Sequence, residues 1–153
     1  MKILLGIDDS KCSEQALETL MKQYKAAETE VLVLHAIESV KLMPPSYSYG
    51  LGPAFAQDYT TILQEWRRQG TELAARAVDR LRTAGFTSTA HVGEGDAREL
   101  ILDWAKNWHP DVILLGSHGR RGLDRLLLGS VAEFITHHAP CSVEIVRAPA
   151  SAA

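Results

Sequence analysis

The chain has 153 residues, of which 46% are apolar and 23% charged, and its formal net charge is −3 at pH 7. This length suits one domain with a sizeable core, and the composition excludes intrinsic disorder. The weakly negative charge argues against a surface that coats nucleic acid. No apolar run approaches the roughly 20 residues that span a bilayer, so a cytoplasmic protein that does not enter membranes is expected.

The first part of the chain alternates strand and helix signals. Residues 2–8 are mostly apolar and predict a buried strand, and Ser10 is placed to cap the helix that follows. Residues 30–37 predict the second strand. The stretch 39–55 is rich in Pro, Ser, Tyr and Gly, which indicates a mobile loop. Apolar residues then recur at helical spacing over residues 59–81, which predicts a long amphipathic helix.

The second part continues the alternation. Residues 87–92 predict the third strand, and Asp96 is placed to cap another amphipathic helix. The apolar, β-branched run at 110–116 is typical of a fourth strand buried on both faces. The last strand is expected at 142–147.

Five strands alternating with helices predict an open α/β fold, with a parallel sheet covered by helices on both faces. Residues 1–148 are expected to form this single domain, and 149–153 a tail. Sheets of this kind bind ligands at the carboxyl ends of their strands, where the strand order reverses.

Closely spaced glycines join the fourth strand to the last helix. Gly116 and Gly119 follow the strand, and after nine further residues Gly129 and Ser130 open the helix. Ser130 is a good N-cap, and Glu133 three residues later completes a capping box. A helix N-terminus presents unpaired N–H groups and a positive dipole end, and glycine admits an anion close to the backbone. The stretch therefore predicts a phosphate cradle.

With its spacing G-x2-G-x9-G-S, this stretch resembles the nucleotide-binding members of the universal stress protein family. The end of the first strand, Asp8-x-Ser10, and the second strand with His35-Ala36 resemble that family as well. The resemblance covers nearly the whole chain and implies a Rossmann-like sheet of strand order 3-2-1-4-5. In that order Asp8 and the loop after Gly116 converge on one crevice, which the resemblance implies to bind ATP or another adenylate.

The resemblance also implies individual roles. Asp8 matches an aspartate near the adenine and ribose that can help to hold Mg²⁺, although it could instead satisfy the dipole of the following helix. Ala36 matches a position whose backbone contacts adenine, or is a core residue behind the site. The full expected nucleotide-binding set is Ile7, Asp8, Ala36, Leu115, Gly116, His118, Gly119, Arg120, Gly129, Ser130 and Val131.

Within the cradle, the Gly129 N–H and the Ser130 hydroxyl are expected to bind phosphate directly. His118, Arg120 and Arg121 are the expected charge partners for the phosphates, with Arg120 preferred. An exposed, solvated arginine is the alternative role for Arg120.

The expected function is adenine-nucleotide binding by a stress-response sensor or regulator. The alternative is an enzyme of the same fold, either a slow ATPase or an adenine-nucleotide hydrolase. Those hydrolases carry a Gly-Gly-x-Asp-Ser loop, whose glycine pair is absent at residues 6–10, where Gly6-Ile7 stands, and the glycine loop has no G-K-[S/T] lysine. A phosphoacceptor receiver domain is disfavoured, because it needs an aspartate ending the third strand and a lysine ending the fifth, where Val92-Gly93-Glu94 and Arg147 stand.

The open edge of the sheet predicts a homodimer. In the implied order the last strand, 142–147, lies outermost, and its unpaired backbone groups can join a second copy of the chain. Ser142 and Glu144 could instead guard this edge against pairing, or Glu144 could point outward or meet Arg147 of the second copy.

Overall fold

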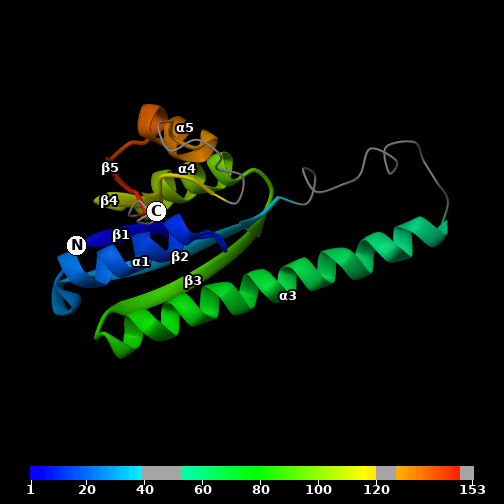
Figure 1. The fold of residues 1–153 in the computed structure, drawn as a ribbon, viewed down its shortest axis with the longest axis horizontal. Coiled ribbons are helices and arrows are strands. Elements are labelled where there is room, and N and C mark those ends of the chain that lie inside the picture. The colour runs from blue at the N-terminus through cyan, green and yellow to red at the C-terminus, as the bar shows by residue number, and fades with distance from the viewer. Residues whose placement is uncertain (39–52, 120–126, 149–153) are drawn as a thin grey trace, which may run out of the picture.

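The computed structural model describes residues 1–38, 53–119 and 127–148. Its fold is a five-stranded, all-parallel sheet of order β3-β2-β1-β4-β5 with helices on both faces (Figure 1). The strands are β1 (Lys2–Gly6), β2 (Glu30–Ile37), β3 (Thr87–Glu94), β4 (Val112–Gly116) and β5 (Ser142–Val146). The described helices are α1 (Lys11–Gln23), the 3-10 turn η1 (Ala26–Glu28), α3 (Pro53–Thr83), α4 (Ala97–Trp108) and α5 (Ser130–His138). The predicted fold class and strand order are confirmed.

Several predicted boundaries shift. β1 ends at Gly6 rather than at residue 8, because the chain turns there to cap α1 and the Asp8 N–H donates to the Ser13 Oγ at 2.9 Å. β5 ends at Val146, one residue early. α3 begins at Pro53, so the last three residues of the predicted loop are helical. The rest of that loop, and the tail at 149–153, lie outside the described residues.

The core lies on both faces of the central strands. Ile3, Leu4 and Leu5 of β1 are fully buried, as expected of a parallel strand covered on both sides. Alternation along the strand sends Leu5 into the cluster under α1 and α3, and Leu4 into the cluster under α4 and α5. The carboxyl ends of β1, β2 and β4 are therefore rigid supports for the loops that follow them.

Helix α3 is longer than the strands that it covers. Its 31 residues span about 46 Å, against about 26 Å for β2 or β3, and its N-terminal part extends past the sheet (Figure 1). Gly70 marks a close approach to β2, because a Cβ there would lie 2.7 Å from the His35 Cδ2 and 3.4 Å from the Val92 Cγ1. Arg67 pairs with Glu94 at the end of β3. Together these contacts fix α3 at the carboxyl ends of the strands.

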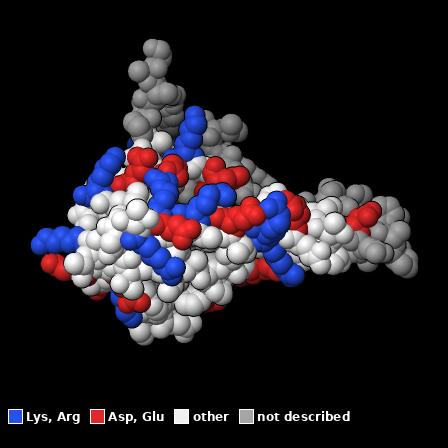
Figure 2. All heavy atoms as spheres, turned by 90° about the horizontal axis from the view of Figure 1, so that it is seen from below, with Lys and Arg blue, Asp and Glu red and all other residues white. Residues whose placement is uncertain are grey.

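The lower face of the molecule in Figure 1, which Figure 2 shows from below, carries charges of both signs. Basic and acidic side chains are interspersed there rather than gathered by sign (Figure 2). Arg68 pairs with Glu65 and Glu72 along α3, and Arg80 of α3 pairs with Glu14 of α1. Exposed pairs of this kind contribute about 0–1 kcal/mol each, so this face is a solvated surface of mixed charge.

Candidate functional site

A cleft of about 780 Å³ lies at the carboxyl ends of the strands. Its walls come from the β1–α1 and β4–α5 loops, the end of β2, one edge of α3 and the first turns of α4 and α5. Every expected nucleotide-binding residue that the structure describes lines it: Ile7, Asp8, Ala36, Leu115, Gly116, His118, Gly119, Gly129, Ser130 and Val131. Arg120 lies outside the described residues.

The peptide groups of Ala36 face the crevice above β1. The Ile7 N–H donates to the Leu34 carbonyl at 2.9 Å, so Leu34 faces β1, and Ala36 two residues later faces the same side. The ladder between β1 and β2 ends at Gly6 and Leu34. The N–H and C=O of Ala36 therefore lie beyond the last paired residue, where they can meet the edge of a planar ligand.

Asp8 shapes the turn into α1. Its Oδ1 accepts from the Ser10 N–H at 3.0 Å, and Ser10 caps the helix by accepting from the Ser13 N–H at 3.1 Å, as predicted. One carboxylate oxygen thus supports the helix start. The other, Oδ2, lies beside the glycine loop, where a Cβ on Gly119 would come within 2.7 Å of it. That oxygen is placed to meet a ligand hydroxyl or a cation.

The β4–α5 loop packs against the start of α1. A Cβ on Gly116 would lie 2.7 Å from the backbone carbon of Cys12, so only glycine lets the two segments approach so closely. The Ser10 hydroxyl donates to the His118 carbonyl at 3.3 Å, and the buried Ser117 Oγ lies 3.1 Å from the His118 Nδ1. The His118 Nε2 is buried and has no hydrogen-bond partner within the described residues.

The start of α5 differs from the predicted capping box. Gly129 is the N-cap, and the helix begins at Ser130; the first intrahelical bond runs from the Glu133 N–H to the Gly129 carbonyl at 2.9 Å. The Gly129 N–H donates to the Ser117 carbonyl at 2.8 Å, so this group is engaged within the loop, and its role as a phosphate donor stays a prediction. The N–H groups of Ser130, Val131 and Ala132 lie in the first turn of α5, where no carbonyl of the helix can accept from them. Because Ser130 is not the cap, its exposed side chain is left to face the cleft.

The wall that α3 contributes was not predicted from the sequence. Trp66, Gln69, Leu73 and Arg76 line the cleft along one edge of this helix. Helical spacing marks Trp66 and Leu73 only as core-facing positions, and no local pattern shows that this edge borders the strand ends. Gly70 could have been the signal, because a glycine inside a helix marks a close backbone approach.

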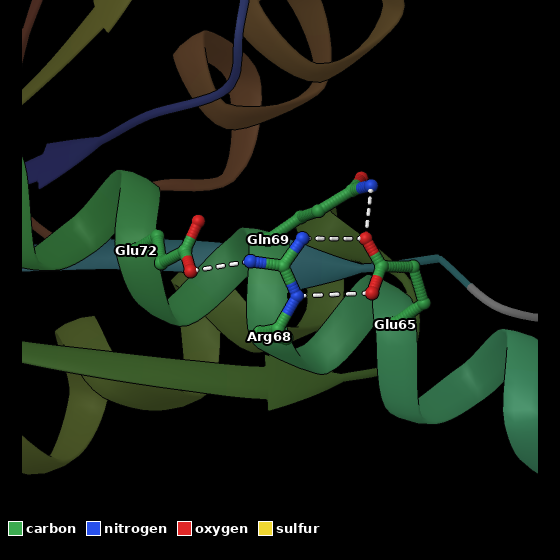
Figure 3. A network of polar contacts seen from close by, with 4 residues as sticks. All are labelled: Glu65, Arg68, Gln69 and Glu72. Atoms are coloured by element: carbon green, nitrogen blue, oxygen red, sulfur yellow. Dashed lines mark hydrogen bonds and ion pairs between the residues drawn. The ribbon is translucent and has the colours of Figure 1, made fainter.

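A hydrogen bond and an ion pair hold two polar residues of this wall, Gln69 and Glu72. Arg68 donates to both carboxylate oxygens of Glu65 at 2.9 and 2.7 Å, and the Gln69 Nε2 donates to the same group at 2.8 Å (Figure 3). These hydrogen bonds, first that from Arg68, lower the pKa of Glu65 to about 2. Arg68 also pairs with Glu72, so one guanidinium fixes two carboxylates beside the cleft (Figure 3).

The first turn of α4 forms the opposite wall. Asp96 caps the helix, as predicted, by accepting from the Arg98 N–H at 2.8 Å. The Arg98 guanidinium donates to both Asp96 oxygens at 2.9 and 2.6 Å and lies 5.3 Å from the centre of the Phe134 ring. The hydrogen bonds to Asp96 raise the pKa of Arg98. The Ala97 N–H donates to Glu38 at 3.3 Å, which ties this turn to the end of β2.

Comparison with known proteins matches the chain along nearly its whole length. A profile described as the Universal stress protein family matches residues 1–147. Universal stress protein A homolog 2 of Coxiella burnetii is 33% identical over 150 residues, which cover 95% of this chain and 94% of that protein. Universal stress protein Sll1388 of Synechocystis is 28% identical over 150 residues, covering 95% and 97%.

Solved structures share the fold. Hypothetical protein MJ0577 has a TM-score of 0.82 at 24% identity, covering 98% of this chain and 97% of that one. A universal stress protein family protein of Arabidopsis thaliana with AMP bound has a TM-score of 0.71 at 21% identity, covering 98% and 93%. Universal stress proteins solved with cAMP and, from Archaeoglobus fulgidus, with dAMP have TM-scores of 0.63 and 0.66 at 20% and 19% identity. At these identities the likeness establishes the fold.

Proposed function

Because the chain belongs to the universal stress protein family, we propose that its cleft binds an adenine nucleotide. The observation that carries the proposal is the meeting of four separate segments, through Asp8, Ala36, Gly119 and Ser130, in one cleft. Related folds solved with AMP, cAMP or dAMP support an adenylate as the ligand. The Ala36 peptide groups would bind the base edge, and Asp8 would bind the ribose.

The glycine loop fits a phosphate chain, which favours ATP among the adenylates. The first N–H groups of α5 and the Ser130 hydroxyl offer several donors to phosphate oxygens, and His118, whose Nε2 has no partner within the described residues, lies beside them. A Cβ on Gly129 would lie 3.2 Å from both the His118 Cα and the Ser117 carbonyl, so a larger residue would close this space. Mg²⁺ would be shared between the phosphates and the Asp8 Oδ2, since the described residues contain no group of three or more metal-binding side chains.

Binding itself is the proposed activity, in a sensor or regulator whose nucleotide occupancy changes its partners during stress. A cytoplasmic location is part of this proposal. Of the helices in the described ranges, none has an apolar stretch long enough to cross a membrane.

Calorimetric titration with ATP, AMP and GTP tests the proposal, together with mass spectrometry of small molecules released by denaturing the purified protein. We expect one adenylate per chain, with GTP binding more weakly. Absence of both a released adenylate and binding heat would contradict the proposal.

Hydrolysis of the bound nucleotide is expected to be slow. Efficient phosphoryl transfer needs a group that orients the attacking water, and His118 is the candidate next to the loop, with its Nδ1 already 3.1 Å from the Ser117 Oγ. Several turnovers per second, lost in His118→Ala while binding is kept, would instead favour the enzyme alternative.

A homodimer through β5 is also proposed, since this strand is outermost in the sheet. The Tyr24 hydroxyl donates to the Glu144 Oε2 at 2.6 Å, so Glu144 is directed toward α1, and the predicted outward or intermolecular pairing of this residue is wrong. The Val146 carbonyl accepts from the Ser117 N–H, so the backbone groups of Val143 and Ile145 are the ones at the open edge.

Light scattering tests the dimer. We expect twice the chain mass of 16.8 kDa, and Ile145→Pro should split the dimer because it removes an edge donor. A monomer at tens of micromolar would exclude this interface.

A further inference from the structure

Trp66 is a large aromatic side chain at the cleft that the fold does not use. Of the three tryptophans, Trp104 lies 4.7 Å from the His91 ring and Trp108 lies 5.0 Å from the Lys2 Nζ. Trp66 belongs to neither core cluster and, within the described ranges, has no ring or hydrogen-bond partner. It is also the tryptophan that lines the cleft.

The position of Trp66 is fixed by its neighbours on α3. Gly70, one turn later, lies against the buried His35 ring, whose Nδ1 is 2.9 Å from the Ile7 carbonyl. The adjacent Arg67 pairs with Glu94 at the end of β3. The indole is therefore carried by a rigid element at the level where β2 ends, which is what a recognition residue needs.

A base bound at Ala36 would lie between α3 and α4. The Ala36 peptide groups point within the plane of the sheet toward the space above β1, while the neighbouring His35 side chain faces α3 and Glu38 contacts the first turn of α4. A purine held by its edge in that plane presents one ring face to each helix. The face toward α3 is the one that Trp66 can cover.

We propose that Trp66 stacks on the base of the bound nucleotide and is a ligand-contacting residue of this chain. The inference rests on the proposed function and deepens it, because it assigns recognition of a planar base to α3. Stacking of a base on an aromatic side chain is sequence-tolerant, so Trp66 adds affinity for any base, and the Ala36 edge supplies the preference for adenine.

Titration of AMP into Trp66→Leu tests the contact. Loss of base stacking should weaken AMP binding roughly tenfold, whereas Trp66→Phe, which keeps an aromatic ring, should stay within about threefold of the parent protein. Ribose 5-phosphate, which lacks a base, should bind Trp66→Leu and the parent protein equally. Trp108→Leu is the matched control, since this tryptophan lies outside the cleft and its loss should leave AMP affinity unchanged.

Tryptophan fluorescence gives a second, independent reading. AMP should quench the parent protein, and this quenching should disappear in Trp66→Phe although AMP still binds. Unchanged AMP affinity in Trp66→Leu, equal weakening of ribose 5-phosphate, or quenching that persists in Trp66→Phe would each overturn the stacking role. A parent protein that binds no adenylate would overturn the proposed function as well.

Discussion

The two ends of the cleft are built in different ways. The proposed phosphate end is built from loop residues whose glycines fall within one stretch of sequence, from Gly116 to Gly129. The α3 wall is one edge of a long helix, and its place depends on the contact between Gly70 and His35, which lie on different elements. The proposed anion site is thus specified locally, whereas the wall proposed to contact the base is specified by helix packing.

The largest effect is expected at the phosphate end. Gly129→Val places a side chain where even a Cβ would be 3.2 Å from the Ser117 carbonyl and the His118 Cα, so it should lower ATP affinity more than about a hundredfold, that is by about 3 kcal/mol or more. Calorimetry measures this loss, and circular dichroism checks that the variant is folded. Parent-like binding by a folded variant would show that the cradle lies elsewhere.

A smaller effect at the same end is expected from Ser130→Ala. Removing a hydroxyl that bonds a charged phosphate costs roughly 1.5–3 kcal/mol, or about tenfold to a hundredfold in ATP affinity. Adenosine, which has no phosphate, should bind the variant and the parent protein equally. Ser142→Ala, at the exposed start of β5, is the control that should change neither affinity.

The α3 wall is tested by Gly70→Ala. The new Cβ would lie 2.7 Å from the Cδ2 of the buried His35 ring, so α3 must move outward, at a cost of about 1–3 kcal/mol in stability. ATP affinity should fall a few-fold, measured by titration beside urea unfolding. Ala75→Gly, on the exposed side of α3, should lose about 1 kcal/mol of stability with unchanged affinity. Equal affinities in both variants would mean that the α3 position does not matter for binding.

The smallest effect on binding is expected from a substitution outside the cleft. Tyr24→Phe removes the hydrogen bond to Glu144 and should cost about 1 kcal/mol of stability without changing ATP affinity. Burial and that bond raise the pKa of Tyr24 from 10.0 to about 12. The bond therefore stabilises the fold fully below pH 10, and this contribution is lost as the pH rises toward 12. Unfolding titrations should show this alkaline loss in the parent protein and not in the variant.

Much of the fold and part of the cleft could be predicted from the sequence. Continuous apolar runs such as Val112–Leu115 indicated the buried strands, and local capping residues such as Ser10 and Asp96 located helix starts. The capping box at Ser130 was wrong because a glycine backbone satisfied the helix start without a side chain. Trp66 and Glu144 could not be assigned, because the Gly70–His35 and Tyr24–Glu144 contacts that place them join residues far apart in sequence.

The overhang of α3 has a consequence for local opening. The part of α3 from Arg67 onward contacts the strand ends and the sheet and shares the cooperative unfolding of the sheet, whereas the earlier, N-terminal part extends past the strands (Figure 1). Amide protons of this earlier part should therefore exchange with solvent through low-energy openings that the rest of the helix does not undergo. Trp66 lies where these two parts of α3 meet. A ligand that stacks on Trp66 would therefore slow amide exchange in the adjoining turns, so that binding in the cleft would order the projecting part of the helix.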